Sequence, residues 1–298
     1  MPLIQLTDYN TVQSTVQSVM GTGTGDFGYG QSLASSQISA GSVVTAQQWI
    51  NLRSDLLKAR QHQTGADESA SIPLAAAGAT IVSSIYSSCS SMAALIVANR
   101  LATPPAGEAT LETVTSSTRT LPWNGVLQQV ITLTWPSDNA ARHFFNTGSN
   151  VQISASRSGG NSGSKNNTWT AMLSGMGTIT FAYSDTTCSG SGTGSSYGWS
   201  NLPGSNTQIF WKPAPAGVYA ENDFYIYARK VSGNQLEFTL EFRDDDTGDQ
   251  QPDPTGYNQP GPAVDEDVDG TLIGTCQVRR ASGSNVSVPA PAATSSQL

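Results

Sequence analysis

Hydrophobic residues recur at steps of three and four through the first hundred residues, which predicts three amphipathic helices. The first runs from a cap at Asp8 to Gly21, and its apolar face is Tyr9, Val12, Val16 and Val19. The second runs from a cap at Thr45 to Gly65, and its apolar face is Trp49, Leu52, Leu56 and Ala59. The third covers about 79–101, and its buried face is Ile81, Ile85, Cys89, Met92 and Ile96. Pro104 and Pro105 then end the helical part of the chain.

Beyond these prolines the hydrophobic period changes from helical to alternating, which predicts half-buried strands. The alternation is found at 126–135, 151–155, 179–183, 224–228, 236–242 and 272–278. The turn sequence SGNQ between Val231 and Leu236 predicts a hairpin in which strands 223–231 and 235–243 pair directly. Because sheets with one wet face are antiparallel, we expect a sandwich or strongly curled sheet across 109–282. The predicted fold class is α+β, with an N-terminal helical region followed by a mainly antiparallel β-sandwich-like domain.

This pattern divides the chain into three regions. Residues 1–103 form a helical region for attachment or oligomerisation, and the boundary lies at 103–108. Residues 109–282 form the β domain. Residues 283–298 are rich in proline and small polar residues, with too little apolar surface to offset the entropy of ordering, so we expect a flexible tail or an arm that orders on a partner.

A short helix is expected inside the β domain, in the stretch RHFFNTGSNVQISASR at 142–157. Asp138 is a suitable cap, Gly148 a suitable stop, and Ala141, Phe144 and Phe145 fall on one helical face. His143 then points away from that face. We interpret this segment as a structural connection between strands, not as a catalytic pocket.

Charge is sparse and unevenly placed. Only 12% of the residues are charged, and the net charge is −8. Residues 1–220 contain nine acids and nine bases, whereas 221–298 contain thirteen acids and five bases. A nucleic-acid-binding protein would carry a stripe of Lys and Arg, so we expect no nucleic-acid partner. The polar, weakly ionic surface is typical of proteins whose copies pack together.

The residue types that carry catalysis are few. The histidines are His62 and His143, so a nucleophilic serine would have to use one of these two as its base. His62 falls near a helix end, where a positive charge is favoured. Glu237 and Glu241 alternate with apolar residues, which predicts that they lie on the solvent-exposed face of a strand. This argues against a glycosidase carboxylate pair. We therefore predict no catalytic residues and no enzymatic activity.

Cofactor and metal motifs are also weak. The loop GTGTGDFGYG contains the spacing GxGxxG at Gly23, Gly25 and Gly28, but a helix precedes it where a dinucleotide site needs a strand. Cys89, Cys188 and Cys276 have neither CxxC spacing nor a nearby histidine. We predict no cofactor, no resident metal and no disulfide framework.

The sequence also indicates where the chain folds. The most apolar window, 79–98, contains six serines, which argues against a membrane span. Residues 1–10 lack the features of a secretory signal, so we expect folding in the cytoplasm.

Two features leave alternatives open. The acidic stretch 244–269 is either a solvated loop or an irregular calcium site, because Asp265, Asp267, Asp269 and Gly270 match the first half of an EF-hand loop while Cys276 stands where its glutamate is required. Four aromatic residues lie in a loop-rich stretch and bind either a glycan or a neighbouring subunit, and we favour the subunit: Tyr197, Trp199, Phe210 and Trp211.

Two stretches resemble a known family. These are VTAQQWINLRSDLLKARQHQTG, and RHFFNTGSNVQISASRSGG followed by NNTWTAML and GTITF. They are similar to virion structural proteins of tailed bacteriophages, particularly tail- and neck-associated proteins of phages that infect cyanobacteria and marine bacteria. The resemblance covers most of residues 1–282. It carries no functional residues.

The resemblance implies a non-enzymatic virion component, a tail, neck or fibre/adaptor protein, that assembles in the host cytoplasm. Its partners would be other copies of itself and other virion proteins. One alternative is a receptor-binding module that recognises host surface polysaccharide, and another is a hydrolase of envelope polymer.

Overall fold

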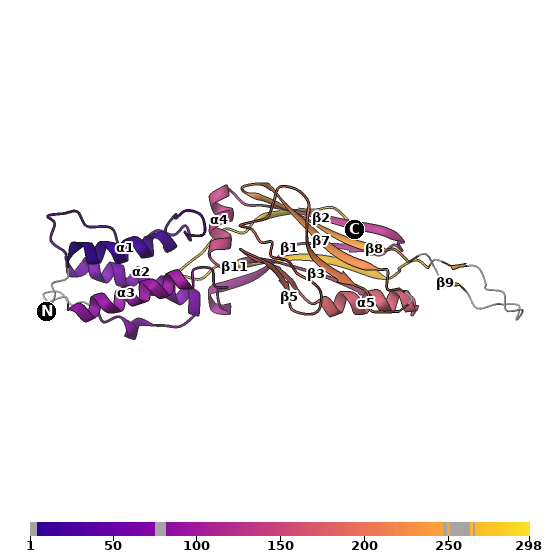
Figure 1. Cartoon of the computed structure of the whole chain (residues 1–298), viewed down its shortest axis with the longest axis horizontal. Coiled ribbons are helices and arrows are strands. Elements are labelled where there is room, and N and C mark those ends of the chain that lie inside the picture. Colours follow the sequence, from indigo (N-terminus) through magenta and orange to yellow (C-terminus); the bar gives the residue numbers. More distant parts are fainter. Residues whose placement is uncertain (1–4, 75–81, 218, 247–248, 251–262, 265) are drawn as a thin grey trace, which may run out of the picture. The chain divides into compact units, whose positions relative to one another are not determined.

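The computed structural model describes residues 5–74, 82–217, 219–246, 249–250, 263–264 and 266–298. The chain forms two compact units, neither of which is continuous in sequence (Figure 1). Unit 1 comprises residues 1–112, 135–150 and 278–290, and unit 2 comprises 113–134, 151–277 and 291–298. The units therefore differ in extent from the predicted regions 1–103 and 109–282, because two later segments join the helical unit. Hydrophobic periodicity identifies elements but does not show which elements return to an earlier one.

Three helices form the core of unit 1 (Figure 1). They are α1 (Leu6–Met20), α2 (Ala46–Thr64) and α3 (Ser83–Ala98), with single 3-10 turns at Ser69–Ser71 and Ala106–Glu108. The predicted apolar faces are buried, and Tyr9 packs edge-on against Trp49 with ring centroids 5.2 Å apart. Ile81 lies outside the described residues.

The helix ends follow the predicted capping chemistry with one correction. Thr45 caps α2 by accepting a hydrogen bond from the Gln48 amide, and Gly65 ends it in the left-handed conformation (φ 72°). Asp8, however, is not the cap of α1, which begins two residues earlier. Its carboxylate lies inside the first turn and accepts a hydrogen bond from the Gln5 amide at 2.7 Å. An acid is stabilised there because the first-turn amides have no partners within the helix.

Unit 1 also contains the short helix α4 (Asp138–Asn146). Its cap is Ser137, one residue before the predicted one, and the Ser137 hydroxyl accepts a hydrogen bond from the Ala140 amide. The predicted aromatic face is confirmed, since Phe144 and Phe145 are fully buried. Phe144 packs edge-on against Phe145 and Trp135, and Phe145 lies tilted against Trp135. Gly148 follows with φ 74°.

The strands form two five-stranded antiparallel sheets, which confirms the α+β, sandwich-like fold class (Figure 1). One has the order β1-β11-β3-β4-β5, with bounds Ala109–Arg119, Thr271–Ala281, Asn150–Ser158, Ile179–Phe181 and Thr186–Cys188. The other has the order β12-β2-β8-β7-β6, with bounds Ala292–Ser295, Gly125–Thr134, Gln235–Asp244, Asp223–Ser232 and Thr207–Pro213. A separate two-stranded antiparallel sheet consists of β9 (Asp249–Gln250) and β10 (Ala263–Val264).

The predicted hairpin is confirmed. β7 and β8 pair directly, with Phe224 opposite Phe242 and Ile226 opposite Leu240. Helix α5 (Ser164–Met176) is not among the elements predicted above, although Trp169, Met172, Leu173 and Met176 are spaced for one buried helical face. The asparagines and threonine before Trp169 have weak helix propensity, so the sequence did not indicate a helix at this position.

The C-terminal segment corrects the prediction of a flexible tail. Val286 and Val288 are buried, and β12 adds to the edge of a sheet, where Ala292 pairs with Thr134 and Ser295 with Ile131. The ladder hydrogen bonds and the two buried valines offset the ordering entropy that the composition alone left uncompensated.

Candidate functional surfaces

The two histidines both hydrogen-bond backbone carbonyls within unit 1. His62 is completely buried, with its Nε2 3.1 Å from the Thr147 carbonyl oxygen and its ring edge-on to Tyr29. Burial lowers the pKa of His62 to about 4. His143 places Nε2 3.0 Å from the Thr22 carbonyl oxygen, and burial also lowers its pKa. Both imidazoles thus position backbone segments.

This burial makes the stability of the protein depend on pH. Between its ordinary pKa of 6.5 and the folded value of about 4, the unfolded chain binds a proton at His62 that the folded chain does not. The free energy of unfolding should therefore fall by about 3 kcal/mol as the pH drops from about 6.5 to about 4. Urea unfolding measured across this range tests it.

The matched variant is His62→Gln, which keeps an N–H donor for the Thr147 carbonyl but does not titrate. Carboxylates also protonate in this range, so the difference between the two proteins isolates the imidazole. An identical pH dependence in wild type and variant would contradict the assignment.

The glycine-rich loop 21–30 folds back on the end of α1. The Tyr29 amide donates to the Val19 carbonyl and the Gly30 amide to that of Gly21. The side chain of Asn146 in α4 donates to carbonyls of the same loop, at Gly25 and Phe27. The loop therefore presents carbonyl oxygens to protein donors, which is opposite to the amide cradle of a phosphate site.

The charged face of α2 is engaged by the chain's own loops. Asp55 is buried and accepts hydrogen bonds from the Ala34 and Ser35 amides. Arg53 donates to the carbonyls of Ser69 and Ile72, and Arg60 forms an ion pair with Glu68 at 3.0 Å. These three charged residues therefore hold loops of the same unit against α2.

By contrast, the surface formed by α1 and α3 carries almost no charge. Within residues 6–20 the single charged residue is Asp8, and residues 83–98 contain none. A groove of about 420 Å³ lies along the two helices, and small uncharged side chains line most of it: Thr11, Val12, Thr15, Ser90, Ala93, Ala94, Val97 and Ala98. Ala94, in the lining, is exposed, and elsewhere on α3 Leu95 is 44% exposed. We call this surface the α1–α3 groove.

The four loop aromatics have different surroundings in unit 2. Phe210 belongs to the buried core, and Trp211 donates its indole N–H to Asp223 at 2.7 Å. The Lys230 ammonium lies 4.3 Å from the ring centre of Trp199, while Tyr197 is 37% exposed. Because Phe210 is enclosed, it contacts neither a glycan nor a neighbouring subunit in this fold.

A second aromatic group, on the outer face of β7 and β8, was missed by sequence reasoning. Tyr225 and Tyr227 stack with ring centroids 5.8 Å apart, and the Arg243 guanidinium covers Tyr225 at 5.0 Å. Asp223 accepts from the Tyr225 hydroxyl. Burial, reinforced by nearby carboxylates, raises the pKa of both tyrosines. The alternation of Phe224, Ile226 and Ala228 was the available signal, since it places the residues between them on the opposite face.

Glu241 lies on this same face but is 5% exposed, which corrects its prediction as a solvent-facing residue. Its carboxylate accepts a hydrogen bond from the side-chain NH2 group of Gln128 and forms an ion pair with Arg243. Glu237 pairs with Arg229 at 2.7 Å. Arginine partners on neighbouring positions thus neutralise both carboxylates.

Most of the acidic stretch 244–269, including Asp265, lies outside the described residues. Asp269 is described, and it joins a network of ordinary protein donors: Arg157, Asn161 and Asn166. Within the described ranges there is no group of three side chains suited to hold a metal ion. The alternatives for this stretch, a solvated loop or an irregular calcium site, therefore stay open.

Comparisons with protein-family models, with curated proteins and with solved structures found no match to this chain. Over the part of the chain that is described, no helix combines the length and apolar character needed to cross a bilayer.

Proposed function

We propose that the chain is a non-enzymatic structural component of a tailed-phage virion, a tail, neck or fibre/adaptor protein, that acts by assembling with copies of itself and with other virion proteins. The observation that supports this is the α1–α3 groove. Assembly would take place in the host cytoplasm, and the virion would be the final location.

The groove suits an interface between helices for a physical reason. Burying a charged side chain in a contact has a large desolvation cost, and the centres of protein interfaces are depleted in charge. Here α1 and α3 carry the single charged residue Asp8, whereas the charged residues Arg53, Asp55 and Arg60 of α2 are bound by loops of the same chain. The small side chains along α1 and α3 leave room for the close approach of another helix.

Self-association is tested by placing a charge in the groove. Ala94→Arg keeps helix propensity high and lies on an exposed position, so it should leave folding intact but disrupt contact between copies. We expect wild-type chains to form a defined oligomer in mass photometry, and the variant to shift the population toward single chains by at least about tenfold in apparent Kd, which corresponds to about 1.4 kcal/mol.

The matched control is Ala40→Arg, an exposed alanine in the loop between α1 and α2, which should leave the oligomer unchanged. A wild-type chain that stays single over the whole accessible concentration range would refute self-association. The virion assignment has its own test, since mass spectrometry of purified particles from the phage that encodes the chain should detect it.

The alternative, a module that recognises host surface polysaccharide, has weaker support. Sugar binding by aromatic residues needs open ring faces, whereas Tyr225 is covered by Arg243 and by Tyr227, and Trp199 by Lys230.

A further inference from the structure

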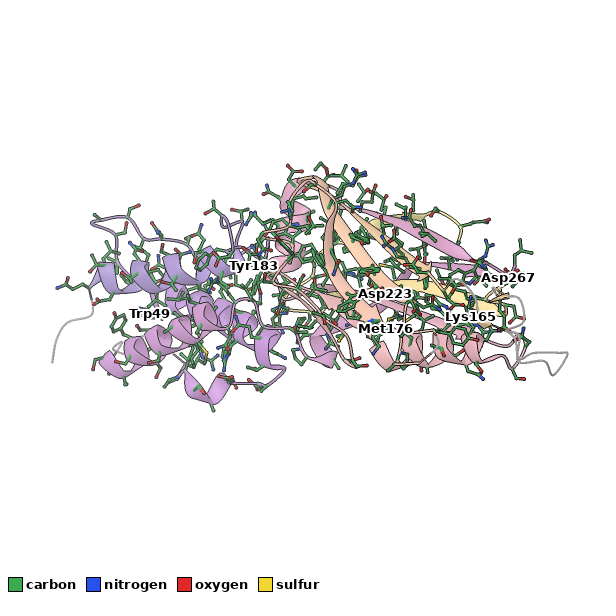
Figure 2. All side chains as sticks on the ribbon, turned by 45° about the vertical axis from the view of Figure 1, so that its right-hand side comes forward. Trp49, Lys165, Met176, Tyr183, Asp223 and Asp267 are labelled. Atoms are coloured by element: carbon green, nitrogen blue, oxygen red, sulfur yellow. The ribbon has the colours of Figure 1, made fainter. Side chains whose placement is uncertain are left out.

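A buried lysine meets two buried aspartates in unit 2. Lys165, in the first turn of α5, is 1% exposed. Its Nζ lies 3.1 Å from Oδ2 of Asp244, the last residue of β8, and 3.1 Å from Oδ2 of Asp246. The side chains of the two aspartates are 0% and 7% exposed. Nζ also donates a hydrogen bond to the backbone carbonyl of Glu266 at 2.6 Å. Figure 2 labels Lys165 and also Asp267, the residue that follows Glu266.

The surroundings hold these three groups in place and keep water away. Trp169 lies one turn along α5 from Lys165 and packs against Trp123 and Phe242. The ring of Tyr219 lies 5.9 Å from Nζ. The Asn222 side-chain oxygen accepts hydrogen bonds from the amides of Asp245 and Asp246, which fixes the backbone that carries the second carboxylate.

We propose that Lys165 and Asp244 form an intramolecular amide bond, with Asp246 as the group that carries the proton. The bond joins Nζ of α5 to Cγ of β8. This modification goes beyond the proposed function and does not depend on it.

The step balances without any other reactant. Asp246 takes a proton from the Lys165 ammonium, and the neutral amine attacks Cγ of Asp244. The tetrahedral intermediate loses a second proton from nitrogen, and one carboxyl oxygen of Asp244 leaves with two protons as water, one of them returned by Asp246. One N–C bond forms, one C–O bond breaks, and no group is oxidised or reduced. The ammonium and carboxylate become a neutral amide, and Asp246 ends in its starting state.

Burial supplies the driving force for this condensation. In water the reaction is unfavourable because the ammonium and the carboxylate are both strongly hydrated. In the interior that hydration is lost, and holding an ion pair there is costly unless the geometry is excellent. An amide removes both charges and releases one water molecule. Because the amine and the carboxyl group are already held in contact, the reaction needs no bimolecular encounter. Intramolecular reactions between groups positioned in this way reach effective molarities of roughly 10⁵ M or more.

The two aspartates differ in the way these roles require. The side chain of Asp244 is fully enclosed, so an amide formed there is protected from hydrolysis. The side chain of Asp246 retains slight exposure, which gives the released water a route out. The resulting link would tie α5 to the end of β8.

Mass spectrometry of the full-length, folded chain tests the proposal directly. We expect an intact mass lower than the sequence mass by one water molecule, and a branched tryptic peptide in which Lys165 is joined to Asp244. A folded chain with its full sequence mass and two separate peptides, after prolonged incubation, would overturn the proposal. A branch at Asp246 would overturn the assignment of the two roles.

Variants separate this chemistry from an ordinary ion pair. Asp246→Asn should retain the fold, as judged by circular dichroism, and lose the branched peptide. Asp244→Asn should still form the link but with loss of ammonia in place of water. Lys165→Arg should abolish the mass change, whereas the control Lys230→Arg, at a half-buried lysine of β7, should keep it. If Lys165→Arg does not fold, the wild-type mass and Asp246→Asn still decide the question.

Discussion

Phe144→Ala should lower the free energy of unfolding by about 3 to 5 kcal/mol, because it opens a cavity in the most concentrated aromatic cluster of unit 1. Phe144 is fully buried, with ring centroids 5.2 Å from Trp135 and 5.0 Å from Phe145. Trp135 and Phe145 are themselves large and buried, so removal of the Phe144 ring leaves unfilled space between bulky side chains. Urea unfolding at neutral pH, followed by tryptophan fluorescence, measures the loss.

The comparison variant is Phe27→Ala. Phe27 is half-buried in the loop after α1, and its ring lies under the Arg100 guanidinium at 4.6 Å. Its removal exposes the site to water without leaving an enclosed cavity, so we expect a clearly smaller loss. Phe144→Leu should fall between the two. Equal losses for Phe144→Ala and Phe27→Ala would show that the cluster is not the packing centre of unit 1.

The aromatic cluster also shows how far sequence reasoning reaches. The spacing of Ala141, Phe144 and Phe145 was enough to predict a helix with this face buried, because helical periodicity is a local property. The same holds for the three N-terminal helices and for the β7–β8 hairpin, whose turn and strands lie within about twenty residues of each other.

The features that were not predicted from the sequence depend on contacts between residues distant in the chain. Lys165 meets residues about eighty positions later, and β12 pairs with a strand about 160 residues earlier. The sequence close to Lys165 and to β12 does not indicate which distant segment each of them contacts. Composition assigned 283–298 to a flexible tail because a polar, proline-rich segment is stable only when another element supplies the hydrogen bonds. Lys165 did carry one usable signal, since it stands four residues before Trp169 and thus on the buried face of α5.

Gly148→Ala should destabilise the protein by about 4 kcal/mol, since it combines two penalties. Gly148 has φ 74°, a conformation that costs an L-residue roughly 1 to 2 kcal/mol. A Cβ at this position would also lie 2.0 Å from the carbonyl oxygen of Ala102, which is backbone and cannot rotate away, and forced repacking of this kind costs about 1 to 3 kcal/mol. Thr147 directly precedes Gly148, and its carbonyl is hydrogen-bonded to His62. A backbone displacement at Gly148 would therefore also disturb that hydrogen bond.

Gly159→Ala is the matched control for this prediction. Gly159 has φ 70°, nearly the same backbone conformation, but a Cβ there would meet no atom within 4 Å. It should therefore show the conformational penalty alone, about 1 to 2 kcal/mol. Chemical unfolding of both variants separates strain from collision, and comparable losses would mean that the close approach of Ala102 to Gly148 contributes little. The difference between them would measure how tightly the segment after α4 is packed against the chain before β1.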